Sequence, residues 1–197
     1  MKHTWMILVI GLLSGASAAT AAEVKLVLHI PQITPQGLQG HANIVSVWVE
    51  DKRANPVFGK DLEGANVTTN QDVAIVVKNA LITSLRAAGF RIEPMRTRNS
   101  TDMLVHIRSL TYSADKNVFT STAHLSSKVS VTVDHAGERA MQKDITTSGE
   151  YTVAWRPSNR KITELVNETL RDTIRAVLED SDISSALKDS SKAAEAN

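Results

Sequence analysis

The sequence predicts an α+β fold, a two-layer sandwich in which two amphipathic helices cover one face of a mainly antiparallel sheet. Apolar residues alternate with polar ones along several segments, as in half-buried strands, and recur at helical spacing in two others. Strands come first, then a helix, more strands and a last helix, an order that favours an α+β fold. The chain of 197 residues has no cysteine, so its core must form without disulfides.

The first 22 residues have the three parts of a secretory signal peptide. Lys2 supplies a basic head, residues 5–13 form an apolar run, and residues 14–22 are mostly small. A buried helix or a membrane anchor would need a longer apolar run, and this one is too short for a permanent transmembrane helix. We therefore predict that residues 1–22 are cleaved and that the exported chain begins at Ala22 or Glu23.

The segments that follow predict two strands, a loop and a short strand. Residues 24–30 and 44–50 alternate as strands do, and residues 51–68 contain proline and glycine and are expected to form a loop. Residues 91–93 form a short strand that ends at a proline.

Between that loop and the short strand lies the first predicted helix. Thr69 is expected to be its N-cap, with Asp72, three residues later, as its capping-box partner. Gly89 is expected to end the helix. Its apolar residues recur on one stripe: Val73, Val77, Ala80, Leu81, Leu85 and Ala88.

The second half predicts three longer strands and the last helix. The strands cover residues 101–112, 119–133 and 141–155, and the last two form a hairpin. Residues expected to point inward from this hairpin are Phe119, Ala123, Leu125, Val129, Val131, Val133, Met141, Ile145, Tyr151, Val153 and Trp155.

Pro157 and Ser158 are expected to end the last strand and cap a helix over residues 159–179. Its apolar stripe is Ile162, Leu165, Val166, Leu170, Ile174 and Val177. A short helical remnant is predicted at residues 183–187, and the polar tail 189–197 is expected to be disordered. Residues 23–188 would then form a single domain.

The charge balance argues against nucleic acid as a partner. Lys2 is one of 22 Lys and Arg residues, so removing the signal leaves as many cations as the 21 Asp and Glu residues. A balanced chain without runs of like charge has no general attraction to nucleic acid or to anionic lipid.

The sequence carries no catalytic or metal-binding signature. No histidine has a second one at ligand spacing on a helix, and the strands of His106 and His124 could pair, but ordinary strand histidines are the simpler interpretation. There is no serine elbow and no phosphate-binding glycine loop. We therefore predict no enzymatic activity, no cofactor and no metal.

One face of the predicted hairpin is rich in hydroxyl side chains. Hydroxyls beside an aromatic ring could bind a glycan or a partner protein, although serine and threonine are also ordinary on the wet face of an antiparallel sheet. The long hairpin also presents an edge that could pair with a partner's strand, and the sequence does not show which strand lies there. The tentative binding face consists of Trp48, Thr122, His124, Ser126, Ser130, Thr146, Ser148 and Thr152.

An extended pattern of motifs resembles the YajG family of bacterial envelope lipoproteins. It is strongest between Ser127 and Ile183, and the first helix with its Gly89 and the strand with Asp102 fit the same layout. The motifs are the run 127–133, the turn at Gly137, Gly149-Glu150-Tyr151, Pro157-Ser158-Asn159, Leu170-x-Asp172-Thr173-Ile174 and Asp180-x-x-Ile183.

The resemblance implies a place at the outer membrane, and it supplies no functional residues. The signal of this family ends in a lipobox whose cysteine carries the lipid, and here the matching stretch is Leu13-Ser14-Gly15-Ala16. Because Ala16 replaces that cysteine, we expect a periplasmic or secreted form, held peripherally at the outer membrane if a partner binds it there.

The sequence therefore predicts a non-enzymatic exported envelope protein that acts as a binding or structural component and has no transmembrane segment after cleavage. Its expected partner is another periplasmic or outer-membrane protein. The alternative is a periplasmic binder of a cell-wall glycan, lipopolysaccharide or another amphiphile on the sheet face.

Overall fold

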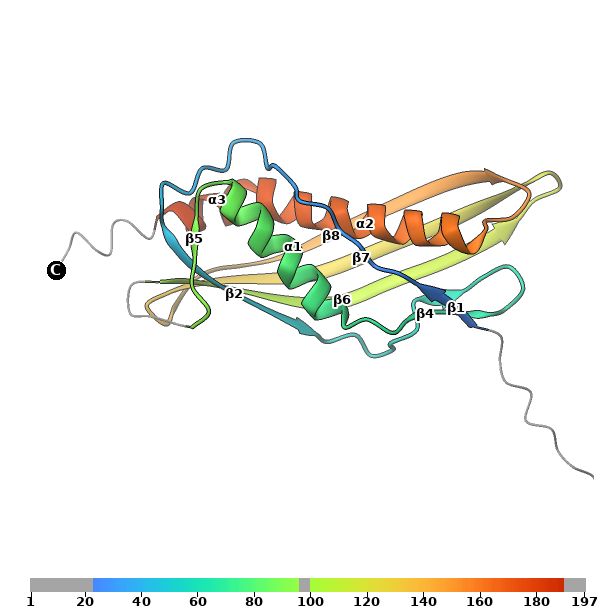
Figure 1. Cartoon of the computed structure of the whole chain (residues 1–197), viewed down its shortest axis with the longest axis horizontal. Coiled ribbons are helices and arrows are strands. Elements are labelled where there is room, and N and C mark those ends of the chain that lie inside the picture. The colour runs from blue at the N-terminus through green and yellow to red at the C-terminus, as the bar shows by residue number, and fades with distance from the viewer. Residues whose placement is uncertain (1–22, 96–99, 190–197) are drawn as a thin grey trace, which may run out of the picture.

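The computed structural model describes residues 23–95 and 100–189, and the α+β class is confirmed there by one sheet and three helices (Figure 1). The predictions for the signal peptide and for tail residues 190–197 lie outside the described residues. The helices are α1 (Val73–Ala87), α2 (Asn159–Glu179) and α3 (Ser181–Lys188). The strands are β1 (Glu23–Leu26), β2 (Ile44–Asp51), β3 (Gly59–Lys60), β4 (Asn66–Thr69), β5 (Arg91–Ile92), β6 (Thr101–Lys116), β7 (Thr120–His135) and β8 (Glu138–Ala154).

The sheet is mixed, which corrects the prediction of a mainly antiparallel sheet. Strands β6, β7 and β8 form a long antiparallel meander, whereas β2 runs parallel to the first half of β6. Parallel neighbours need a long crossover connection, and α1 lies within the one that joins β2 to β6. The second half of β6 pairs instead with β3, through Gly59 and Tyr112, and β3 leads on to β4 and β1. The two-layer description is therefore matched only in part.

Helix α2 forms where it was predicted. Ser158 is its N-cap and accepts a hydrogen bond from the backbone of Lys161 at 3.2 Å. All six residues of the predicted stripe are buried, and the helix packs on β7 and β8. Burying that stripe removes several large aliphatic side chains from water, at about 1.5–3 kcal/mol each. The face of the meander that α2 covers is called the inner face below.

Helix α1 starts three residues later than predicted. Asp72 is its N-cap and accepts a hydrogen bond from the backbone of Ile75 at 3.1 Å. Thr69 belongs to β4, and its hydroxyl donates to the carbonyl of Leu26 on β1 at 3.0 Å. The predicted capping residue is thus used to hold two strands together, and the strand pairing decides where the helix can begin.

Three further predictions were wrong. The expected loop 51–68 contains β3 and β4, which are short and owe their pairing to distant residues. Phe119 lies in the turn between β6 and β7 and is 81% exposed. Trp155 follows the end of β8, where its φ of 65° breaks the alternation, and it is 72% exposed.

The first predicted strand is also shorter than expected, because pairing with β4 stops at Leu26. Residues 27–38 continue as an extended segment that passes between α1 and α2, and we call it the N-terminal strap (Figure 1). Val27 is exposed, and four further apolar side chains are buried: Leu28, Ile30, Ile33 and Leu38. Side chains from α1 and α2, rather than a neighbouring strand, bind part of its backbone, as with Ser84, whose hydroxyl accepts from the backbone of Ile33 at 3.0 Å.

Tyr112 is expected to make stability fall in alkali. Its hydroxyl is buried and has no hydrogen-bond partner among the described residues. Burial, followed by the charges of Asp61 and Glu63, raises its pKa to about 12. Because the unfolded state deprotonates more easily than the folded state, the free energy of unfolding keeps its full value below the unfolded pKa of about 10. It falls by roughly 2–3 kcal/mol as the pH rises towards 12.

Urea unfolding of Tyr112→Phe across this pH range tests the expectation. The variant should match the wild type near neutral pH, because the lost hydroxyl made no hydrogen bond. It should lose most of the alkaline decline of the wild type, whereas the control Tyr151→Phe should lose a smaller part, because Tyr151 is only half-buried and burial raises its pKa less strongly. An equal decline in wild type and Tyr112→Phe would contradict the assignment.

Candidate functional site

The candidate site lies on the outer face of the meander, the side turned away from α2. Side chains alternate along β7 and β8, so apolar residues point to the inner face and polar ones to the outer face. The register places Thr122 opposite Thr152, Ser126 opposite Ser148, and His124 opposite Glu150. Six of the eight predicted binding residues therefore form one continuous patch on two strands: Thr122, His124, Ser126, Thr146, Ser148 and Thr152.

The other two predicted residues do not join this patch. Ser130 is on the same strand face but is buried, so it cannot contact a ligand from solvent. Trp48 lies on β2 opposite Leu104, which pairs in turn with Thr132. Eight residues of β7 separate that position from His124, roughly 26 Å at strand spacing. The ring of Trp48 also has the ammonium of Lys78 at 5.3 Å from its centre. It is not a platform for the patch.

The patch surrounds a shallow hollow of about 510 Å³. Its walls include Thr111 and Ser113 of β6, two residues that sequence reasoning missed because the prediction considered only the hairpin partners. The pairing of β6 with β7 brings them beside Ser126 and His124, and no local signal in the sequence reports that register. The remaining lining residues are His124, Leu125, Ser126, Ser148, Gly149 and Glu150.

His124 is the one imidazole in this hollow, and two carboxylates flank it. Its Nε2 lies 3.2 Å from Asp115 Oδ2, and its Nδ1 lies 3.9 Å from Glu150 Oε2. Hydroxyls, an imidazole and a carboxylate on an open surface can exchange hydrogen bonds with a polyhydroxylated ligand. Among the described residues no group of three or more His, Asp or Glu side chains could hold a metal ion.

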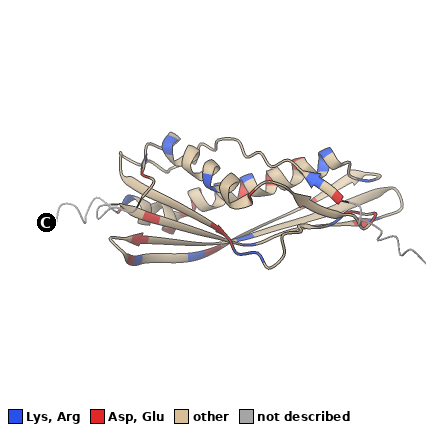
Figure 2. Ribbon diagram, turned by 60° about the horizontal axis from the view of Figure 1, so that its bottom comes forward, with Lys and Arg blue, Asp and Glu red and all other residues tan. Residues whose placement is uncertain are grey.

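Ion pairs continue along the outer face. Lys128 lies 2.9 Å from Asp144, and its hydrogen bond to that carboxylate holds the pKa of Asp144 below its usual value. On β2, the hydrogen bond of Lys52 to Glu50 lowers the pKa of that carboxyl in the same way. Figure 2 shows Lys and Arg interspersed with Asp and Glu along the described residues, an arrangement that gives little general attraction for a charged ligand.

Strand β8 forms the edge of the meander. It pairs with β7 along one side, and no described strand pairs with its other side. It is 17 residues long, against about 5–6 for an ordinary strand. The middle of the strand, residues 145–149, carries no charge and no proline. Lys143 and Asp144 precede this stretch and Glu150 follows it. An uncharged edge is open to pairing with another strand.

No helix within residues 23–95 and 100–189 has the length and apolar character needed to cross a membrane.

Comparison with known proteins adds a family. A family model described as "uncharacterized lipoprotein" matches residues 31–188. No curated protein matches the sequence.

Several solved structures are similar at low sequence identity. Protein XCC0632 of Xanthomonas campestris has 10% identity and a TM-score of 0.49, over 90% of this chain and 100% of that one. A minor lipoprotein of Acinetobacter baumannii has 11% identity and a TM-score of 0.46, over 79% and 94%. The rare lipoprotein B of Shewanella oneidensis has 15% identity and a TM-score of 0.44, over 79% and 98%.

Proposed function

Since this chain belongs to the family of uncharacterized lipoproteins, we propose that it is a non-enzymatic component of the bacterial envelope that binds another envelope protein along the free edge of β8. Within that family, the motifs between Ser127 and Ile183 favour the YajG group. The same motifs and the predicted signal peptide favour a periplasmic place, peripheral to the outer membrane.

The observation that carries this proposal is the long unpaired edge of β8. A partner strand laid along residues 145–149 would satisfy backbone groups that now face solvent, which is how strand addition gives affinity. The inner face is already occupied by α2, so the edge is the side of the meander that remains open to a strand. Lys143 forms ion pairs with Asp180 and Asp182 at 2.8 and 2.6 Å, so its ammonium is directed towards α3. Its charge therefore does not discourage strand pairing at the free edge of β8.

Single-cysteine crosslinking in intact cells tests the proposal. The chain has no cysteine, so Thr146→Cys and Ser148→Cys each place one reactive site on the exposed edge strand. A short cysteine-linked photocrosslinker at these positions is expected to capture one and the same envelope protein. Thr111→Cys is the matched control, because it is exposed on the same outer face but lies on β6, two strands from the edge.

The hollow around His124 favours a second candidate, a periplasmic binder of a glycan or lipopolysaccharide. The same variants separate the two functions. A ligand in the hollow should slow maleimide labelling of Thr111→Cys and Ser148→Cys, which line it, and leave Thr146→Cys unaffected. Capture from β8 with unchanged labelling of Thr111→Cys supports the strand-edge function. Equal capture from Thr111→Cys and the β8 positions contradicts it.

A further inference from the structure

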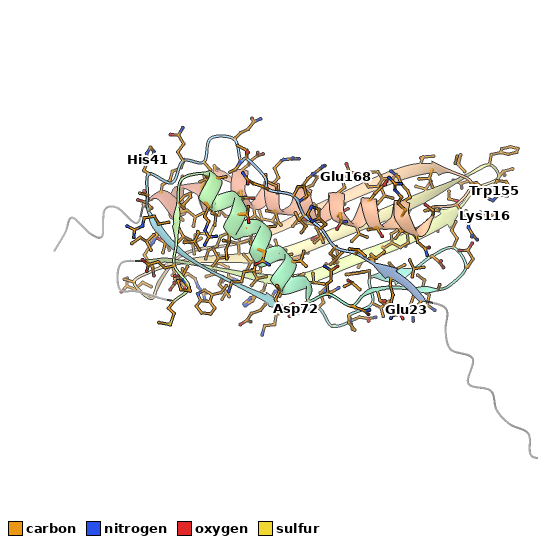
Figure 3. The ribbon with its side chains drawn as sticks, viewed as in Figure 1. Glu23, His41, Asp72, Lys116, Trp155 and Glu168 are labelled. Atoms are coloured by element: carbon orange, nitrogen blue, oxygen red, sulfur yellow. The ribbon has the colours of Figure 1, made fainter. Side chains whose placement is uncertain are left out.

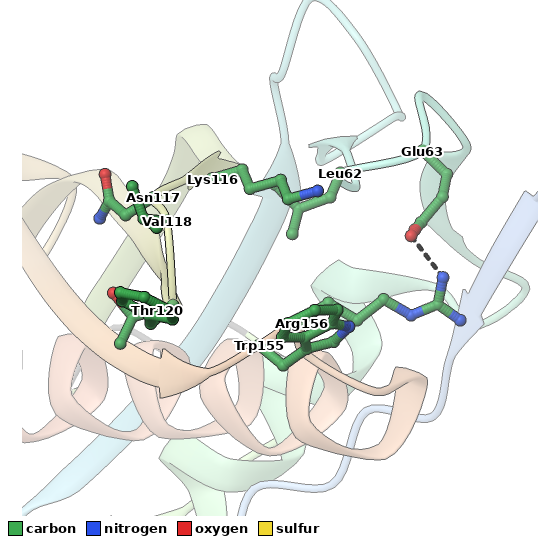
Figure 4. A pocket seen from close by; sticks show the side chains of 9 residues that line it. Leu62, Glu63, Lys116, Asn117, Val118, Thr120, Trp155 and Arg156 are labelled. Carbon is green, nitrogen blue, oxygen red and sulfur yellow. Dashed lines mark hydrogen bonds and ion pairs between the residues drawn. The ribbon is translucent and has the colours of Figure 1, made fainter.

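One end of the molecule carries three large apolar side chains in water. Val118 and Phe119 form the turn between β6 and β7 and are 80% and 81% exposed, and Trp155 lies beside them after β8 at 72%. We call these three residues the apolar tip. They border a cavity of about 380 Å³ that Lys116, Arg156 and Leu62 also line (Figure 4).

The backbone conformation at both turns presents the side chains of the apolar tip to solvent. The amide of Asn117 donates to the carbonyl of Thr120 at 2.8 Å and closes the turn that presents Val118 and Phe119. Trp155 has a left-handed backbone with φ of 65°, which is costly for a residue with a bulky side chain. The hydroxyl of Ser121 donates to the carbonyl of Trp155, and Arg156 pairs with Glu63 (Figure 4). These contacts hold the carbonyl of Trp155 and the side chain of Arg156 next to the exposed indole.

The tip lies at the end of the molecule where the described chain begins. Figure 3 shows Glu23, Lys116 and Trp155 towards the same end of the long axis, with His41 at the other. Because Ala16 stands where the lipobox cysteine would be, a contact with the bilayer would have to be made by the folded domain itself. We propose that the apolar tip inserts into the interfacial layer of a lipid bilayer, a property beyond the protein-binding function proposed above.

The chemistry of the tip fits a bilayer better than a protein. Tryptophan and phenylalanine with cations beside them are typical of residues that sit at the membrane interface. Here Lys116 and Arg156 flank the tip, and Arg160 follows in the first turn of α2. A stable protein interface needs about 800 Å² of complementary surface on each side. The turn between β6 and β7 and the end of β8, which carry the tip, lie at one narrow end of the sheet (Figure 1).

Flotation with lipid vesicles tests the inference. The protein should float with vesicles of phosphatidylethanolamine and phosphatidylglycerol, and Phe119→Glu should lower its partition coefficient at least about tenfold, because one large apolar side chain leaving water is worth that much. Ile75→Glu is the matched control, since Ile75 is 56% exposed on α1, away from the tip. Thermal unfolding verifies that both variants are folded.

Quenching by brominated lipid locates the contact. Both variants also carry Trp5→Phe, so that each keeps a single tryptophan. Tryptophan emission should be quenched in Trp48→Phe, where Trp155 remains, and not in Trp155→Phe, where Trp48 remains. Failure of the wild type to float, equal flotation of Phe119→Glu, or quenching retained in Trp155→Phe would each overturn the inference. Capture of a protein from position 119 without vesicle binding would likewise replace the bilayer by a protein partner, and would leave the β8 edge function untouched.

Discussion

Gly59→Ala is expected to destabilise the protein by about 3 kcal/mol, which is at the upper end of the cost of overpacking. Gly59 pairs with Val67 of β4 and with Tyr112 of β6, so its backbone is held on both sides. A Cβ at this position would lie 1.8 Å from the carbonyl oxygen of Tyr112, a backbone atom that cannot turn away as a side chain would. The alanine must therefore push β3 off β6.

The damage should be local in origin and measurable as such. Because β3 connects β6 to β4 and β4 connects to β1, loss of the Gly59 contact should loosen β1, β3 and β4 before the long meander. Urea unfolding gives the free energy, and amide hydrogen exchange should show faster opening at Val67 than at Val131 on β7. Faster exchange at both residues alike would contradict the local origin.

Gly64→Ala is the matched control for Gly59→Ala. Gly64 also has a positive φ, 82°, but nothing lies within 4 Å of the place its Cβ would take. It should therefore cost only the strain of a left-handed alanine, about 1 kcal/mol. Equal destabilisation by both substitutions would show that the contact with β6 carries no special energy.

Local patterns predict the elements whose burial is decided by their own sequence. The stripe from Ile162 to Val177 predicts α2 and its buried face because one period holds over the whole helix and Ser158 caps it. The alternation of β7 predicts that Thr122, His124 and Ser126 share the outer face, since each strand residue simply takes the side opposite to its neighbour.

What the sequence does not predict depends on distant partners or on where a strand stops. Phe119 and Trp155 keep the alternating pattern, yet both lie just past a strand end, where the period no longer fixes the side. Thr111 enters the hollow only through the register of β6 with β7, and Gly59 becomes part of a strand only because Tyr112 is beside it. The free edge of β8 follows from the order of the strands in the sheet, which alternation within one strand cannot report.

Removing the two amides that bind the N-terminal strap is expected to cost about 2–3 kcal/mol in Gln71→Ala with Asn167→Ala. Gln71 accepts from the backbone of Leu28 at 2.5 Å and donates to its carbonyl at 3.1 Å, as a neighbouring strand would. Asn167 of α2 accepts from the backbone of His29 at 3.0 Å and donates to the carbonyl of Val27 at 3.2 Å. Both substitutions leave strap backbone groups without these partners.

Each single variant should cost about 1 kcal/mol, and the control Asn159→Ala, in the exposed first turn of α2, should cost less. Amide exchange at Leu28 and His29 should quicken in the double variant while exchange in β7 follows the global stability. The strap runs across α1 and α2 and buries Leu28, Ile30 and Ile33, so its release would uncover apolar surface (Figure 1). Unchanged exchange at Leu28 and His29 would mean that these buried side chains, rather than the two amides, fix the strap.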